Sequence, residues 1–496
     1  MERRLYVFAA CAFIMAAVLG SAWITGQFTT PAVDRTHGYV SELAARDQPW
    51  SRLFRVSDAL SGLACVLGVL LVPRVAREWP GWLALAAFGV FTFLGGLFPL
   101  DCATLSDPAC GGSGTSLSHL LHALTGVSGT LAVLAAMALL GARWRSWVSW
   151  ALTWLSLVAT LLLVIALIAG HGAGLAHRAQ LTVIAFWLVY VALHLLVADE
   201  PSPAPVTGDD PYGEDTCLRV APGRMGGVGG ARVLPPPPPD AAARVQVSHH
   251  TETHVVEEGT GPAVLITAGP GGAWFHWDAV AGLLAGSRRV VRFDRPGLGR
   301  SARPVAPPTL YAEVARLVAL APAHPERVTL VAHGVACWHA EAFARLHPLC
   351  LAGLVLVDPA CVAGRRPLAA ARTAGRWLPV LGGTWGAAVV ARLAGPAAHR
   401  LLTGRPDPSG VYTMGKVPAA MAGEWLARRD MAADLLLLRA GKPFPAVPVT
   451  VISGDDADAC QARLATALGA AHVRLPMAGR RLPLRAAQAI ADAVNA

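Results

Sequence analysis

The chain of 496 residues carries a formal net charge of +9, and 54% of its residues are hydrophobic whereas only 15% are charged. About a quarter of the residues in soluble domains of ordinary composition are charged, so this balance favours a protein with membrane segments. The positive charge is spread over single arginines without interleaved aromatic residues, which excludes a nucleic-acid-binding surface.

Six apolar stretches precede Asp199, and each is long enough to cross a hydrocarbon core of about 30 Å, which takes roughly 20 helical residues. The first stretch follows Arg3 and Arg4, as a signal peptide would, but its length and the spans behind it predict an uncleaved helix. The sequence therefore predicts a transmembrane domain over residues 1–199, in contact with lipid. The six spans are residues 5–25, 57–75, 79–100, 117–142, 147–169 and 180–197.

Arginines near the ends of the spans predict the orientation of this domain. In the short loops of one side Arg178 stands alone. By the positive-inside rule the other side is cytoplasmic, which places both termini in the cytoplasm and the protein in the inner (plasma) membrane. Four arginines of the loop after the first span oppose this orientation: Arg35, Arg46, Arg52 and Arg55. The cytoplasmic set is Arg3, Arg4, Arg74, Arg77, Arg143 and Arg145.

The nine cysteines are too scattered for a disulfide framework, and none lies in a cluster with zinc-ligand spacing. Cys102 and Cys110 differ from the others because they share a short polar loop between the third and fourth spans. The predicted orientation places this loop on the oxidising side of the membrane, where a disulfide between the two is expected.

Ionisable residues at the outer ends of the spans are candidates for a functional site in the membrane half. His119 and His122 are three residues apart and therefore lie on one helix face, and Asp58 lies near the start of the second span. One hypothesis is a metal or proton site formed by these three side chains. The alternative, which we favour, is that such groups sit at the interface and are satisfied by water or backbone.

The first 200 residues resemble an uncharacterised family of six-helix bacterial membrane proteins, a domain of unknown function. The resemblance rests on SELA at 41–44, DALSG at 58–62 and FPLDC at 98–102, with Cys110 and the two histidines beyond. It implies a six-helix bundle and brings no known activity.

Residues 200–243 differ abruptly in composition from what precedes them. Alternating prolines, an acidic patch and a glycine-rich run are followed by five consecutive prolines at 235–239. Such a segment cannot bury a core, and we predict a disordered tether with a stiff polyproline piece. The proline run also fits the aromatic groove of a partner protein, although a simple spacer is the favoured interpretation.

From residue 244 to 496 short β-rich runs alternate with helical stretches, which predicts a mostly parallel sheet with helices on both faces. An alanine-, arginine- and tryptophan-rich segment, 360–438, interrupts this alternation before the last strands. The predicted strands are 245–248, 253–257, 263–267, 290–293, 328–331, 353–357, 447–452 and 472–475.

This part resembles the α/β-hydrolase family over nearly all of its length. The resemblance rests on TAGPG at 267–271, FDRPGLGRS at 293–301 and LVLVDP at 354–359. It implies the α/β-hydrolase fold, with 360–438 in the place of the helical cap.

The catalytic residues that the family needs are missing from two of three positions. The nucleophile turn, G-x-S-x-G between a strand and a helix, reads AHGVA at 332–336, so Gly334 replaces the serine. Arg480 follows Gly479 where the histidine is expected, and arginine cannot act as a base. Asp456 lies one position from the usual place of the acid, as does Asp458.

Two backbone features of the site do not depend on these side chains. The N–H groups of Gly269 and Val335 stand where an oxyanion hole is built. Together with an Arg480–Asp456 pair, they are expected to bind a small anionic ligand, a carboxylate or phosphate, without turning it over. The alternative is that Arg480 forms only a surface ion pair.

The leading hypothesis is a cytoplasmic, catalytically inactive hydrolase-fold domain that binds a ligand, senses or acts as a scaffold at the membrane. A second hypothesis is an active ester or amide hydrolase with non-standard residues, such as Cys337. A third places metal-dependent activity in the six-helix half, at Asp58, His119 and His122. No cofactor is expected, and the protein partners are not identified by the sequence.

Overall fold

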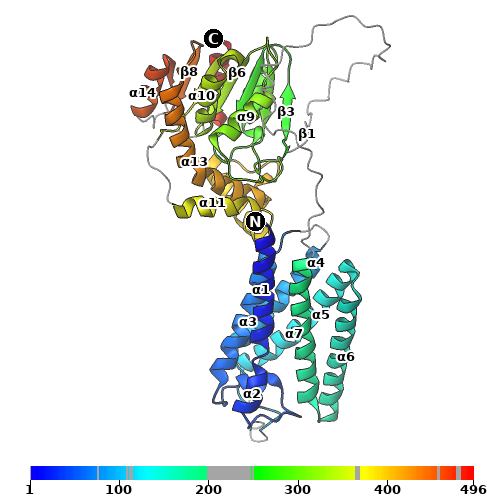
Figure 1. Ribbon diagram of the computed structural model, residues 1–496. Coiled ribbons are helices and arrows are strands. Elements are labelled where there is room, and N and C mark those ends of the chain that lie inside the picture. The colour runs from blue at the N-terminus through cyan, green and yellow to red at the C-terminus, as the bar shows by residue number, and fades with distance from the viewer. Residues whose placement is uncertain are drawn as a thin grey trace, which may run out of the picture. The chain divides into compact units, whose positions relative to one another are not determined.

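The computed structural model describes residues 2–74, 78–107, 110, 116–197, 247–248, 251–362, 369–454, 459–475 and 482–496. The helices α1 to α7 form one compact unit, and the sheet with its covering helices forms the other (Figure 1). The expected tether at 200–243 lies outside the described residues, as do Asp456 and Arg480.

The N-terminal unit is a bundle of long apolar helices (Figure 1). Within the described residues, six stretches are long and apolar enough to cross a membrane, the first of them running through α1 and α2. The protein is therefore a multi-pass membrane protein. Its helices are α1 (Glu2–Gly20), α2 (Trp23–Thr29), α3 (Ser51–Leu71), α4 (Trp79–Leu97), α5 (Leu117–Trp144), α6 (Trp147–Ala169) and α7 (Ala173–Val197), with a short 3-10 helix, η1 (Val40–Ala44), after α2.

The last span begins at Ala173, seven residues before the predicted start. The helix can begin there because the charged side chain of Arg178, in its first turns, is hydrogen-bonded. The guanidinium of Arg178 is buried and donates to the backbone carbonyls of Gly38 and Gly174 at 3.0 and 2.9 Å. A charge that is hydrogen-bonded in this way can stay inside a helix that hydropathy alone would start later.

Helices α3 and α4 approach closely through small residues. A Cβ atom on Gly62 would lie 2.4 Å from the carbonyl oxygen of Gly89, so only glycine fits at this crossing. Large buried side chains such as Trp82 and Trp187 fill the centre of the bundle, and leucines cover its outer surface. This distribution matches a bundle that faces lipid.

The C-terminal unit is built on a seven-stranded sheet with the order β3-β5-β4-β6-β7-β8-β9. The first strand runs antiparallel to its neighbour β5, and all the other pairs are parallel. The predicted mostly parallel sheet is thus confirmed. The strands are β3 (Val255–Glu258), β4 (Ala263–Thr267), β5 (Arg289–Phe293), β6 (Val328–His333), β7 (Leu351–Val357), β8 (Val449–Ser453) and β9 (Ala471–Arg474).

The first predicted strand, 245–248, is not part of this sheet. Its described residues form β1 (Val247–Ser248), which pairs only with β2 (Thr251–Glu252) in a separate antiparallel ladder.

Successive residues of the central strands face opposite layers of helices, as the pleat requires. Leu265 and Leu330 pack under α9 (Leu310–Leu320), α10 (Ala336–Leu346), α13 (Lys416–Gly441) and α14 (Ala459–Leu468). Ile266 and Val331 pack under α8 (Asp278–Leu284) and α16 (Ala487–Asn495). Fully apolar strands such as β7 are explained by burial on both faces.

Among the described residues between β7 and β8, where the sequence predicts a cap, the α-helices are α11 (Ala369–Leu381), α12 (Trp385–Thr403) and α13. Helix α13 belongs only partly to such a cap, because Met431 and Leu435 in its second half are buried in the core against the sheet. The helix also continues to Gly441, three residues past the predicted end of the segment.

Two disulfides link described cysteines. One joins Cys102 to Cys110 within the loop between α4 and α5. The other joins Cys361, after β7, to Cys460 in α14, 99 residues later. The spacing of the cysteines, which predicted no disulfide framework, gave no sign of this bridge, because the parallel sheet brings distant segments together at one end.

Candidate functional site

The turn between β6 and α10 has the geometry of a nucleophile elbow without a nucleophile. Gly334 adopts a φ of +61°, in the left-handed region where a side chain is strained. Its N–H donates to the carbonyl of Val357 at 3.0 Å and its own carbonyl accepts from Ala360 at 3.1 Å, so both neighbouring segments hold the turn. The strand-turn-helix predicted from AHGVA is therefore present, and its central residue offers no reacting atom.

The turn after β4 lies against this elbow. A Cβ atom on Gly334 would lie 3.2 Å from Cδ of Pro270 and 3.9 Å from the Cα of Gly269. In the part of the chain that the structure describes, the N–H groups of Gly269 and Val335 donate to no other residue. Two peptide donors are thus left at this end of the sheet, as an oxyanion hole would have them.

Cys337 is the nearest thiol to the elbow, and its surroundings oppose a nucleophilic role. Its Sγ is buried and donates to the backbone carbonyls of Ala332 and Val357 at 3.3 and 3.7 Å. Burial raises the pKa of the Cys337 thiol well above its usual value. Because the thiolate is the nucleophilic form, this cysteine is inert in its present position.

A cavity of about 200 Å³ opens beside Gly269, and three histidines from distant parts of the chain line it. They are His276, His333 and His399, and the phenol of Tyr412 lines the same cavity. The Tyr412 hydroxyl donates to the carbonyl of Gly271 at 2.6 Å, so it ties η6 (Val411–Thr413) to the turn after β4.

Two of these imidazoles share one hydrogen bond. The N–H of Ala273 donates to Nδ1 of His276 at 3.3 Å, so Nε2 of that ring carries its hydrogen and donates to Nε2 of His399 at 3.0 Å. Protonation of His276 at Nδ1 would place a second hydrogen against the N–H of Ala273, which disfavours the charged ring. Burial lowers the pKa of His276 to about 4, and burial likewise lowers the pKa of His333 to about 4. The cavity therefore presents neutral rings near pH 7.

An internal ion pair fixes the loops around the elbow. The buried guanidinium of Arg295 donates to the carboxylate of Glu424 at 2.6 Å, and also to the carbonyls of Ala268 and Gly269. The other oxygen of Glu424 accepts from the N–H of Gly271 at 3.0 Å. Burial opposes the charge of Arg295, but nearby Glu424 outweighs it and raises the pKa of Arg295, so the guanidinium stays charged. It clamps the turns after β4 and β5 to α13.

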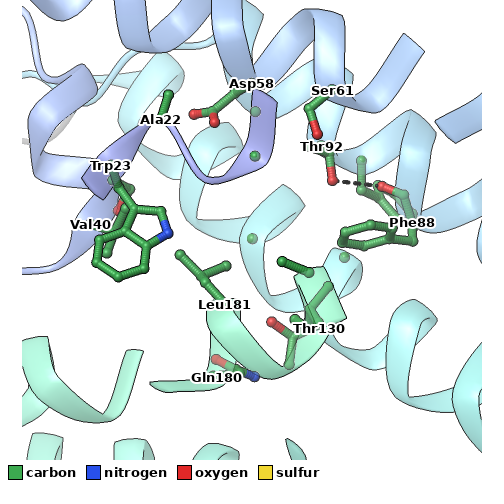
Figure 2. A pocket seen from close by; sticks show the side chains of 18 of the residues that line it. Ala22, Trp23, Val40, Asp58, Ser61, Phe88, Thr92, Thr130, Gln180 and Leu181 are labelled. Carbon is green, nitrogen blue, oxygen red and sulfur yellow. Dashed lines mark hydrogen bonds between the residues drawn. The ribbon is translucent and has the colours of Figure 1, made fainter. Parts of the chain in front are cut away.

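A second candidate site is a cavity of about 180 Å³ inside the helix bundle. Figure 2 shows Asp58, Trp23 and Phe88 at this cavity, on α3, α2 and α4 respectively. Polar residues from α5 and α7 complete the wall, among them His122 and Gln180. The lining thus combines one carboxylate, the aromatic rings of Trp23, Phe54, Phe88 and Phe91, and several neutral polar groups.

The three proposed metal ligands are not brought together. Asp58 and His122 line the cavity, but His119 lies outside it, where its Nδ1 accepts from the N–H of Asp101 at 3.5 Å. Nδ1 of His122 donates to the carbonyls of Gly95 and Phe98 at 3.0 and 2.7 Å. Within the described ranges no group of three His, Cys, Asp or Glu side chains could hold a metal ion. This correction follows from packing, which turns neighbouring histidines of α5 to different partners.

Sequence reasoning missed His276, His399 and Tyr412. His276 and His399 are 123 residues apart, and Tyr412 is 141 residues from its partner Gly271. No local motif marks them, and only the fold of α12 and η6 over the sheet brings them to the loop after β4. In the bundle, Gln180 was missed for the same reason.

Family models match both halves of the chain. Residues 9–194 match a family described as "Protein of unknown function (DUF998)". Residues 263–493 match the "Alpha/beta hydrolase family". Both predicted resemblances are thus confirmed, one for the membrane bundle and one for the sheet domain. No curated protein sequence matches the chain.

Several solved structures are similar to about half of this chain. Cfl2 from Burkholderia cenocepacia is 22% identical, with a TM-score of 0.40, and the match covers 51% of this chain and 94% of that one. The thioesterase domain from the curacin biosynthetic pathway is 19% identical, with a TM-score of 0.41 and coverages of 51% and 99%. Haloalkane dehalogenase DbeA from Bradyrhizobium elkani is 19% identical, with a TM-score of 0.40 and coverages of 51% and 96%.

Proposed function

We propose that this chain, a six-helix membrane module joined to an α/β-hydrolase-fold domain, acts through ligand binding and not through covalent catalysis in that domain. The observation that carries the proposal is Gly334, a residue without a side chain at the tip of a nucleophile elbow. Covalent acyl transfer needs an activated atom at this point. The inert thiol of Cys337, the nearest substitute, adds to the argument.

The ligand that we propose for the domain is small and carries a carboxylate or another anionic oxygen. The N–H groups of Gly269 and Val335 support it, because two unpaired peptide donors favour an oxygen acceptor. Neutral histidines beside Gly269 can donate a hydrogen bond to the same oxygen without adding charge. A domain that binds in this way would serve as a sensor or a scaffold at the membrane.

The experiment uses the purified full-length protein in detergent or nanodiscs. We expect no labelling by a fluorophosphonate probe and no hydrolysis of p-nitrophenyl acetate or butyrate above the buffer rate. Binding of acetate and butyrate is followed in parallel by the shift of thermal unfolding. Labelling by the probe, or turnover that disappears in Cys337→Ala, would overturn the proposal.

The location follows from the charge distribution and belongs to the same proposal. We place the protein in the inner (plasma) membrane with both termini in the cytoplasm, and the domain boundaries at 1–199, 200–243 and 244–496. Three of the six candidate spans separate the Cys102–Cys110 loop from the hydrolase-fold domain, so in this proposal the two lie on opposite sides of the membrane. The bridge between Cys361 and Cys460 would then lie in a reducing compartment, which makes its state in cells a direct test of the orientation.

A further inference from the structure

We propose that the cavity inside the helix bundle binds a small organic ammonium ion, with Asp58 as its counter-ion. This site is separate from the hydrolase-like elbow, so it does not depend on the function proposed above. The inference rests on the size of the cavity, the unpaired carboxylate, the hydrogen-bonding state of the wall and the aromatic rings that face it.

The cavity lies toward one end of the bundle. It is lined where α1 ends, at Ala17 and Gly20, and near the starts of α3 and α5, at Asp58 and His122. Its volume of about 180 Å³ slightly exceeds that of an engineered cavity of about 150 Å³ that takes benzene. A molecule of several non-hydrogen atoms therefore fits, and a single water does not fill it.

The carboxylate of Asp58 is the charged group of this cavity. Among the described residues it has no hydrogen-bond or ion-pair partner, although it lies within a membrane-spanning helix. The nearby arginine of the same helix is engaged elsewhere, because Arg55 donates to the carbonyls of Gly96 and Leu97 at 3.2 and 3.0 Å. A carboxylate inside a span is costly unless it is paired, so this site favours a cation.

Three of the five hydroxyl groups that line the cavity are left as acceptors. Ser61 donates its hydrogen to the carbonyl of Ala16 at 2.8 Å, and Thr92 donates to that of Phe88 at 2.9 Å. Thr125 likewise donates to the carbonyl of His122 at 2.9 Å. Each hydroxyl has a single hydrogen, so only lone pairs remain for a ligand.

The histidine and the glutamine of the wall add further acceptors. Nδ1 of His122 donates to two backbone carbonyls, which leaves Nε2 of the neutral ring as an acceptor. Nε2 of Gln180 donates one hydrogen to Thr160 at 2.7 Å, which leaves its second N–H and the amide oxygen. His177 differs, because its Nδ1 accepts from Val40 at 3.4 Å and its Nε2 therefore carries hydrogen. Taken together, the polar groups of the wall still favour a ligand that donates hydrogen bonds.

Aromatic rings select an organic cation over a hydrated metal ion. Trp23, Phe88 and Phe91 line the same cavity, and ring faces attract ammonium groups. A hydrated alkali or alkaline-earth ion instead seeks six or so oxygen ligands, and apolar walls do not supply them. The combination of one carboxylate, acceptor groups and aromatic faces is the chemistry that recognises an alkylammonium.

The test measures binding of methylammonium chloride and tetramethylammonium chloride to the full-length protein in nanodiscs, by calorimetry and by tryptophan fluorescence. Sodium chloride at the same ionic strength is the reference. We expect saturable binding of at least one ammonium, weakened by about 30-fold or more in Asp58→Asn. The matched control is Asp47→Asn, an exposed carboxylate outside the cavity, which should leave the affinity unchanged within about twofold.

A second variant keeps the proposal testable if Asp58→Asn does not fold. Phe88→Leu retains the carboxylate and removes a ring, and it should weaken binding of tetramethylammonium by about threefold or more. Three results would overturn the proposal: no saturable binding of either ammonium to the wild type, unchanged affinity in a folded Asp58→Asn, or an equal response to sodium chloride.

Discussion

The Cβ position of Gly334 lies 3.2 Å from Cδ of Pro270, so the residue before the elbow helix and the turn after β4 are in near contact. Ordinary carbon contacts are optimal at about 3.5 to 4 Å. A side chain at position 334 would therefore press against the ring of Pro270.

The first prediction concerns restoration of the serine. Gly334→Ser should not create a hydrolase, since the new Cβ meets Pro270, and it should lower stability by about 1–3 kcal/mol because φ is +61°. Thermal unfolding and a p-nitrophenyl acetate assay measure the two effects. Gly282→Ser is the control, as a Cβ atom there has open space. A burst of acyl-enzyme in the Gly334 variant would contradict the interpretation.

The second prediction concerns the clamp between Arg295 and Glu424, whose side chains are 5% and 14% exposed. Glu424→Gln should destabilise the protein by about 3–5 kcal/mol, because a buried guanidinium loses its counter-charge. Denaturant unfolding measures the change. The matched control on the same helix is Asp430→Asn, which breaks a pair to Arg372 with exposed fractions of 37% and 56% and should cost about 0–1 kcal/mol. Equal losses in both variants would contradict a special role for the clamp.

The third prediction concerns pH. Burial lowers the pKa of His276 to about 4 in the folded protein, whereas an unfolded histidine has a pKa of about 6.5. Between these two values the unfolded chain binds the proton and the native one does not. The free energy of unfolding should therefore fall as the pH falls from about 6.5 to 4, and this contribution should be absent above that window.

Thermal unfolding between pH 4 and pH 8 measures this dependence. His276→Gln should flatten the slope, since it removes the group that titrates differently in the two states. His171→Gln is the control, because His171 is exposed on the loop before α7. An unchanged slope in the His276 variant would show that other groups dominate acid sensitivity.

The fourth prediction concerns the two disulfides in cells. With the termini in the cytoplasm, Cys361 and Cys460 should be reduced and should react with a membrane-permeant maleimide without prior reduction. Cys102 and Cys110, in the loop on the other side, should react only after a reductant is added. Gel shifts of single-pair cysteine variants in intact cells measure both. Protection of Cys361 and Cys460 would place the hydrolase-fold domain outside the cytoplasm.

Local sequence patterns were sufficient for the elements that depend on short-range physics. Hydropathy over some 20 residues predicted the spans, and fully apolar runs such as β7 predicted central strands. The span that begins at Ala173 shows the limit of such local patterns. Hydropathy counts Arg178 as polar and starts the span later, whereas in the folded protein a loop carbonyl accepts a hydrogen bond from its guanidinium. The same limit applies to Cys361 and Cys460, whose spacing has no meaning until the sheet is formed.

The sequence by itself determined that a membrane bundle is joined to a hydrolase-like fold, and that the elbow has Gly334 where a nucleophile is needed. Those conclusions depend on composition, periodicity and contiguous motifs, which a chain carries before it folds. Only the tertiary structure decided that Pro270 faces the elbow, that His276 bonds to His399, and that Asp58 has a cavity before it and no partner among the described residues. These relationships join residues far apart in sequence, and packing geometry alone selects which polar group meets which.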